Sequence, residues 1–245
     1  MPTINTVNNQ FLNNVTVTTA VAAATSSVTI ENLDNTNAAS HAKAAITTGG
    51  ASGGDAFIHF TNNVVDWTIG VDNSDSDAFV ISQSATPGTT NAARCDTAGE
   101  WTYPLQPGFC AQKDADALNV TGAGALYTVV GNVETADRTA DYSTVTGNFT
   151  AAVTGKYLLS ASVMLKGNTI GYNTSNSIVT SNRFYYLESR HPASNENCAA
   201  GGSVIADMDA ADTAYSAVKG EGEAGNTADF NGTTDNNHFS GALLQ

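Results

Sequence analysis

The stretch FTAAVTGKYLLSASVMLK, residues 149–166, decides the fold expected for this chain. Between residues 156 and 166 apolar side chains recur at every second position. One face of the segment carries Tyr157, Leu159, Ala161, Val163 and Leu165. The opposite face carries Leu158, Ser160, Ser162, Met164 and Lys166. A period of two is the pattern of a β-strand with one buried face, so the segment predicts a long strand of a two-sheet sandwich.

Further strand patterns lie on both sides of this segment, separated by turns rich in Gly, Asn and Asp. On the C-terminal side we expect strands over residues 178–187, 203–205, 213–218 and 238–244. On the N-terminal side we expect shorter strands over residues 15–19, 28–30, 56–60, 66–71 and 78–81. Helical patterns are almost absent; residues 20–24 form the only short candidate. The sequence therefore predicts an all-β chain.

The length of the strands changes along the chain, which suggests a division into three parts. Pro104 and Pro107 restrict the backbone and mark a junction. We expect an N-terminal attachment or trimerisation segment at 1–53, a β-stalk at 54–103 and a jelly-roll head at 104–245. The strands of the stalk are too short for one chain to bury a two-layer core, so we expect three intertwined chains, each supplying one face of a prism.

The overall charge excludes several classes of partner. The formal net charge is −14, from 23 acidic and nine basic residues. Such a surface repels nucleic acid and anionic membranes, so neither is an expected partner. No apolar run is long enough to span a membrane, and the first residues lack the basic and apolar regions of a signal peptide. Cys95, Cys110 and Cys198 form no CxxC pair; Cys110 is expected to be buried, and a Cys95–Cys198 bridge stays open.

Four segments in order carry a resemblance to a known family. They are PGFCA at 107–111, the stretch at 149–163, MDAADTAY at 208–215 and FSGALL at 239–244. Together they resemble the globular head of complement component 1q, related to the tumour necrosis factor jelly rolls. Ala152 stands where that family usually has Pro. The resemblance implies a ten-stranded jelly roll that assembles as a homotrimer.

The resemblance also suggests roles for particular residues. In such heads apolar residues at the base of each subunit meet around a threefold axis. Candidates for that axis, or equally for ordinary core packing, are Phe109, Tyr157, Phe239 and Leu243. Calcium binds at the apex of such heads, and the acidic loops with Asp207, Asp209 and Asp212 could hold it, although a solvated turn is the favoured interpretation. No other cofactor is expected.

A second resemblance concerns residues 54–102. The pattern GDAFIHF…DWTIGVDNSDSDAFVIS…TAGEW resembles repeats of phage tail fibres and of structural proteins of marine phages. This resemblance implies a virion component that is assembled in the host cytoplasm. Other virion proteins are then expected partners.

Catalytic chemistry has no sequence signal in this chain. It contains no G-x-S-x-G, H-E-x-x-H, Walker or Rossmann motif, and its four His residues are dispersed. Residues 72–77, DNSDSD, resemble the start of a calcium loop but lack its Gly at position six, so we expect a hairpin turn. We therefore expect a protein that is not an enzyme.

Three functional hypotheses remain open. The first is a trimeric virion fibre or spike whose N-terminal part docks on the particle and whose head contacts a host glycan or protein. Residues expected on loops for such a contact are Tyr172, Asn173, Arg190 and His191. The second is a purely structural decoration or adaptor protein of a virion. The third is a bacterial lectin-like surface module.

Overall fold

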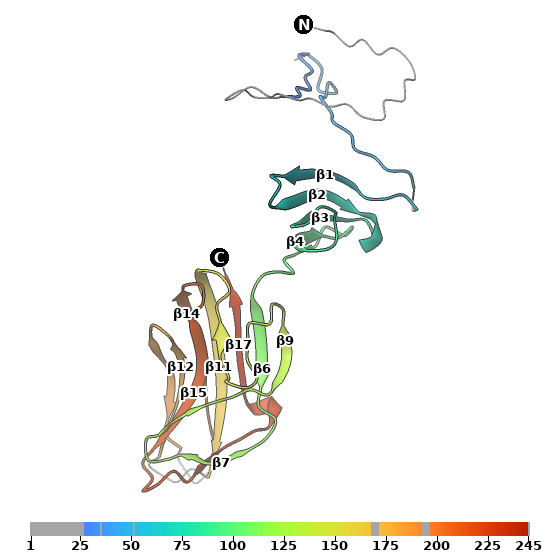
Figure 1. The fold of residues 1–245 in the computed structure, drawn as a ribbon. Helices are drawn as coiled ribbons and strands as arrows, with labels where there is room; N and C mark the ends of the chain where they lie inside the picture. Colours follow the sequence, from blue (N-terminus) through green and yellow to red (C-terminus); the bar gives the residue numbers. More distant parts are fainter. Residues whose placement is uncertain (1–26, 35, 51, 168–171, 193–196, 245) are drawn as a thin grey trace. The chain divides into compact units, whose positions relative to one another are not determined.

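The computed structural model describes residues 27–34, 36–50, 52–167, 172–192 and 197–244 (Figure 1). The chain divides into two compact units, residues 1–50 and 51–245. The boundaries expected at 53/54 and 103/104 stay a prediction. The patterns at 15–19 and 20–24 lie outside the described residues.

In the part of the first unit that is described, residues 27–34 contain no strand. The strand predicted for 28–30 was therefore wrong. Val28 and Ile30 are both largely exposed, so no neighbouring strand covers the β-branched residues that suggested one.

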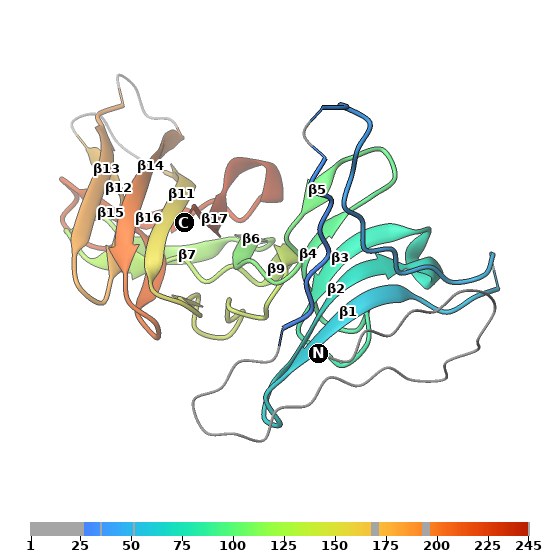
Figure 2. The same cartoon turned by 90° about the horizontal axis from the view of Figure 1, so that it is seen from above.

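The N-terminal sheet is an antiparallel meander in which each strand pairs with the next (Figure 2). Its strands are β1 (Ala56–Thr61), β2 (Asp66–Asp72), β3 (Ala78–Ser82), β4 (Asn91–Cys95) and β5 (Trp101–Thr102). Between β2 and β3 lies a 3₁₀ turn at Asn73–Asp75, where the Asp72 carboxylate accepts the backbone N–H groups of Ser74 and Asp75. This is the Asx-type hairpin turn predicted for 72–77.

Two sheets build the C-terminal sandwich, and their strand order is that of a jelly roll. One sheet has the order β7-β16-β11-β17-β6-β9, with β14 on the other side of β11. The other has the order β10-β15-β12-β13, with β8 also paired to β15. Strands of the first sheet are β6 (Gly108–Gln112), β7 (Ala117–Thr121), β9 (Val133–Asp137), β11 (Gly155–Lys166), β14 (Cys198–Met208), β16 (Ala228–Phe230) and β17 (His238–Leu243). Those of the second are β8 (Leu126–Thr128), β10 (Phe149–Thr150), β12 (Asn173–Thr180), β13 (Phe184–Arg190) and β15 (Thr213–Glu221).

Aromatic rings fill one end of the space between the two sheets. The Phe109 ring stacks on Phe149 at 4.6 Å and on Tyr142 at 5.2 Å between centroids. Phe239 meets Phe109 edge-on at 4.9 Å. Offset stacking and edge-to-face contacts are the favoured geometries of aromatic pairs. A second, more aliphatic cluster around Leu165 and Phe230 fills the other end.

An amide links the two sheets between these clusters. The buried Asn176 of β12 donates from Nδ2 to the carbonyl of Ala161 in β11 at 2.9 Å. Burying an amide is costly unless it finds such a partner, so this bond fixes the position of one sheet over the other.

The prediction of an all-β chain with a jelly-roll head is confirmed. Two details differ. The strand predicted for 178–187 is interrupted, because Ser181, Asn182 and Arg183 turn the chain between β12 and β13. The sandwich also has twelve strands in its described residues instead of ten. The intertwined trimeric stalk stays a prediction.

Candidate functional site

The outward side chains of β11 leave an apolar centre on the open side of its sheet. Alternation places Tyr157 and Leu159 in the core and Leu158 outside, where 41% of Leu158 is exposed. Across the strand pair lies Ile205 of β14, with 58% exposed. Two neighbouring aliphatic side chains on an open sheet are unusual in position, because the outward side of an antiparallel sheet is normally polar.

Small, uncharged residues surround this pair. We define the β11 face by the outward residues of β14, β11, β17 and β6: Ile205, Ser203, Leu158, Ser160, Ala242, Ser240, Gly108 and Cys110. The Ser203 hydroxyl donates to Ser160 Oγ at 3.0 Å, so these hydroxyls bond each other. Along β11 itself the outward charges lie at its two ends, where Lys156 pairs with Asp207 in register and Lys166 binds Asp116 at 2.8 Å. The centre of the face therefore offers apolar surface without charge.

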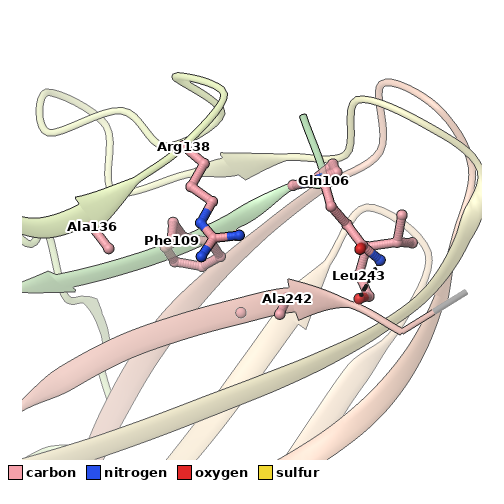
Figure 3. Close-up of a pocket in the computed structure, with 9 residues that line it drawn as sticks. Gln106, Phe109, Ala136, Arg138, Ala242 and Leu243 are labelled. Atoms are coloured by element: carbon pink, nitrogen blue, oxygen red, sulfur yellow. Dashed lines mark hydrogen bonds between the residues drawn. The ribbon is translucent and has the colours of Figure 1, made fainter. Parts of the chain in front are cut away.

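Two shallow hollows lie on and beside this face. One, of about 250 Å³, is lined by Leu158, Ser160, Ser240, Gly241 and Ala242. The other, of about 340 Å³, lies where β6 begins between β17 and β9, and there Arg138 extends over Phe109 and Gln106 lies beside Leu243 (Figure 3). The Gln106 amide donates to the Leu243 carbonyl at 3.1 Å. The small residues of β17 thus leave room for a large side chain from outside.

A pair of exposed aromatic rings lies on β13, the end strand of the other sheet. Phe184 and Tyr186 are 48% and 54% exposed, and their centroids lie 5.5 Å apart. The Tyr186 hydroxyl bonds Ser175 Oγ at 3.3 Å, and Lys219 Nζ lies 6.0 Å from the Tyr186 ring. One subunit therefore presents the apolar centre of the β11 face and, on the other sheet, a pair of half-exposed rings.

The residues expected at the core or the threefold axis lie in the core. Phe109, Tyr157 and Phe239 are buried, and Leu243 packs partly buried against the same cluster. The Tyr157 hydroxyl donates to the Val153 carbonyl at 2.8 Å. Burial raises the pKa of Tyr157 above its ordinary value. None of the four belongs to the β11 face, although Tyr157 and Leu158 are neighbours in sequence.

The residues expected on loops for host contact divide into two groups. Tyr172 is 1% exposed, and burial raises its pKa to about 12. Its side chain lies against Gly220, where any Cβ would collide with the phenol, so Tyr172 is a core residue and not a surface contact. The other three, Asn173, Arg190 and His191, lie together where β12 begins and β13 ends.

Two of these three residues are already engaged. The Ser189 hydroxyl donates to Asn173 Oδ1 at 2.6 Å. Arg190 forms an ion pair with Glu188 at 2.6 Å, which raises the pKa of the guanidinium. Two hydrogen bonds lower the pKa of Glu188, and the bond from the Gly201 N–H has a larger effect than the bond from Arg190. His191 is exposed.

The acidic turn considered for calcium is organised by hydrogen bonds within the chain. Asp212 accepts from Ser181 Oγ at 2.7 Å, Asn182 Nδ2 at 2.6 Å and the Asp209 N–H at 2.8 Å. These hydrogen bonds lower the pKa of Asp212, and the bond from Ser181 has a larger effect than the bond from the Asp209 N–H. Across the described residues no three His, Cys, Asp or Glu side chains converge as a metal site. The Asp212 carboxylate is therefore already engaged by hydrogen bonds from within the chain.

Sequence reasoning did not single out Leu158, Ile205, Phe184 or Tyr186. The signal for Leu158 is present, because the second face of its strand carries no charge between Lys156 and Lys166. The signal for Phe184 and Tyr186 was the alternation within RFYYLE at 183–188, which puts Tyr185 and Leu187 inside. Only the pairing of β11 with β14 brings Ile205 beside Leu158, and this cannot be read from the sequence.

The free cysteines follow the same placement. Cys198 is buried in β14, whereas Cys110 is half-buried and faces outward. The burial expected for Cys110 is therefore incomplete. All three thiols are free, so the structure does not contain a Cys95–Cys198 bridge.

No helix in the described part of the chain is long and apolar enough to cross a membrane. The sequence matches no protein-family model and no curated protein. Among solved structures the chain is similar to the globular domain of zebrafish complement 1qA protein, with 15% identity and a TM-score of 0.43 over 57% of this chain and 98% of that one. It is also similar to murine APRIL at pH 5.0, with 12% identity and a TM-score of 0.42 over 57% of this chain and 99% of that one.

Proposed function

We propose that the chain assembles as a homotrimer through the β11 face and serves as a non-enzymatic attachment protein of a virion. The observation that carries the assembly is the uncharged centre of this face. Leu158 and Ile205 lie exposed side by side there, in a chain with a net charge of −14. Burying them removes apolar surface from water, which favours association.

The geometry favours a ring over a two-fold dimer. The β11 face carries a shallow hollow, whereas Phe184 and Tyr186 are about half exposed on a strand of the other sheet. When two different surfaces of one subunit meet, the contact is heterologous, and repeated contacts close into a ring if the rotation allows. The sequence resemblance to trimeric heads favours three subunits in that ring.

Charge explains why this face is suited to self-association. Copies of an acidic chain repel one another, so acidic residues at a contact would oppose assembly. The two charged pairs beside the β11 face, Lys156 with Asp207 and Lys166 with Asp116, lie at its ends and are balanced in sign. The contact region thus avoids the repulsion that the rest of the surface exerts.

Attachment would depend on three copies acting together. Three identical heads raise the effective concentration of each weak contact without any strong single site. The polar group of Asn173, Arg190 and His191 is the proposed contact with a host glycan or protein. The N-terminal part would bind other virion proteins, as the resemblance of residues 54–102 to tail-fibre repeats suggests. Catalysis, nucleic-acid binding and membrane insertion form no part of this proposal.

Leu158→Asp tests the assembly. Chromatography with light scattering should give the mass of three chains for the original protein and of one chain for the variant. The reason is that assembly would bury an unpaired carboxylate at each contact between subunits. Val145→Asp is the matched control, since Val145 is 85% exposed and not part of the β11 face. A single-chain mass for the original protein at micromolar concentration would refute the homotrimer.

Binding to host cells tests the attachment role. The trimer should bind, Leu158→Asp should bind far more weakly through lost avidity, and Arg190→Ala should weaken binding without changing the mass. If the original trimer binds neither cells nor their surface glycans, the chain is a structural decoration or adaptor instead. If only Arg190→Ala is without effect, the group at residues 173, 190 and 191 is not the contact.

A further inference from the structure

The N-terminal sheet exposes an almost wholly apolar face. Register places alternate residues of its five strands on one side of the sheet, and none of them is charged. We define the stalk face by these residues: Ile58, Phe60, Trp67, Ile69, Val71, Phe79, Ile81, Cys95 and Trp101.

Polar and charged groups lie on the opposite side of the same sheet, and the chain itself covers that side. His59 contacts Asp66 there at 2.8 Å. Thr68, Asp72 and Ser82 are buried, and the loop after β3 reaches back so that the Gly88 N–H donates to Ser82 Oγ at 3.3 Å. The covered side also holds the buried Ala78 and Val80, so it is mixed in character, whereas the open side of the sheet is apolar.

The open side is large for a subunit that remains alone. Ile58, Phe60, Trp67, Phe79 and Trp101 are each between 39% and 56% exposed. Given the area of such side chains, they leave roughly 500 Å² of apolar surface in one patch, at the upper end for a monomer. A hollow of about 430 Å³, lined in part by Phe60, Val65 and Trp67, lies at one end of this patch.

We propose that three copies of this chain pack their stalk faces together around a common axis, each sheet forming one wall of a prism. The number three rests on the homotrimer proposed above. The choice of further copies as the occupant rests on charge: in a chain of −14, the stalk face is the side of this sheet without an acidic residue, so equivalent faces meet without repulsion. The linked heads also hold the three sheets at high effective concentration.

The two tryptophans make this proposal directly measurable. The chain has two Trp residues, and both, Trp67 and Trp101, lie on the stalk face. Trp101 meets Phe79 edge-on at 6.2 Å between centroids. Their fluorescence emission and its quenching by acrylamide therefore report on the burial of this face and of no other surface.

The experiment uses the full chain with Ile58→Asp and Phe60→Asp. Both residues are about half exposed in the single chain, so an Asp is solvated there and the sheet can still fold. In the original protein the emission should be blue-shifted and poorly quenched. Each variant should shift the emission to the red and raise the quenching constant several-fold, while the heads keep the mass at three chains. Val145→Asp is again the control and should change neither reading.

The outcomes separate this inference from the proposed head contact. Unchanged emission in both stalk variants, or strongly quenched tryptophans in the original trimer, would overturn the stalk contact and leave the head trimer standing. A single-chain mass with quenched tryptophans would overturn both. In Leu158→Asp, tryptophan burial that is lost on dilution supports contact between copies, whereas burial independent of concentration would mean that the chain covers its own stalk face and would refute the proposal.

Discussion

Phe109 shows how single residues hold the sandwich together. Its ring contacts Phe149 of β10 in one sheet and Phe239 of β17 in the other. It also contacts Tyr142, which lies in the segment between β9 and β10. Through these contacts, Phe109 helps to hold the strands of both sheets in position, and not only its own strand β6. Replacing any ring of the cluster should therefore loosen both sheets at once.

Phe149→Ala tests this at the residue scale. Phe149 is fully buried, and a Phe-to-Ala change in a core costs about 3–5 kcal/mol through lost burial and a residual cavity. Urea unfolding at fixed chain concentration should show a loss of that size. Val145→Ala, at a site 85% exposed, should change the free energy of unfolding by less than about 0.5 kcal/mol. Equal effects of the two variants would contradict the core assignment.

Asp212 provides a prediction that depends on pH. Its folded pKa is lowered by the Ser181 and Asp209 bonds, so its stabilising contribution is complete above the ordinary Asp pKa and is lost as the pH falls through the lower, folded value. Asp212→Ala should lower the melting temperature near neutral pH. The difference from the original chain should shrink in acid. A difference that stays constant down to strongly acidic pH would show that the carboxylate is not responsible.

The sequence predicts inward residues better than it predicts loop residues. Alternation alone placed Tyr157 and Leu159 on one side of their strand, and both are buried. The prediction for Tyr172 was wrong, because the Asn-rich sequence around it suggests an exposed loop. Its burial depends on Gly220, which is distant in sequence and leaves space for the phenol only after β12 pairs with β15.

At the scale of elements, β17 matters because its small residues form the hollow on the β11 face. If a ring from a neighbouring subunit occupies that hollow, Ala242→Trp should fill it from within and prevent the contact. Ala242 points outward and is exposed, so the larger side chain leaves the core intact. Light scattering should then give the mass of one chain. A variant that keeps the mass of three chains would show that the hollow is not part of the contact.

The β12–β13 hairpin shows where element prediction fails. Residues 178–187 look like one continuous strand because apolar and aromatic residues dominate both ends. The Ser181-Asn182 pair is the turn signal within them, and its side chains bind Asp212 of another loop. The turn is thus fixed partly by a tertiary contact that the local pattern does not contain.

For the whole molecule, net charge opposes assembly and salt should relieve this opposition. Raising the salt shortens the screening length from about 30 Å at roughly 0.01 M to about 10 Å at roughly 0.1 M. With −14 on each chain, the proposed trimer should dissociate less readily as salt rises over that range. Dilution series followed by light scattering will measure this. Weaker association at the higher salt would indicate that ion pairs hold the subunits.

Fold class was readable from the whole sequence, whereas the candidate site was not. Periodicity and turn residues predict an all-β chain because both are local properties. The β11 face requires four strands whose order in the sheet differs from their order in the chain. Leu158 and Ile205 become neighbours only through that order, so the β11 face cannot be predicted without the topology of the sheet.

The position of β17 between β11 and β6 has a consequence for biosynthesis. Residues 238–243 are made long after both of their partners, so the ribosome delivers the middle strand of a sheet last. Until then β6 has no neighbour on that side, and its backbone groups stay open to unintended pairing with other nascent chains. Native closure of the head therefore has to wait for residues 238–243, and translation that stops short of residue 238 should yield aggregates instead of a smaller folded head.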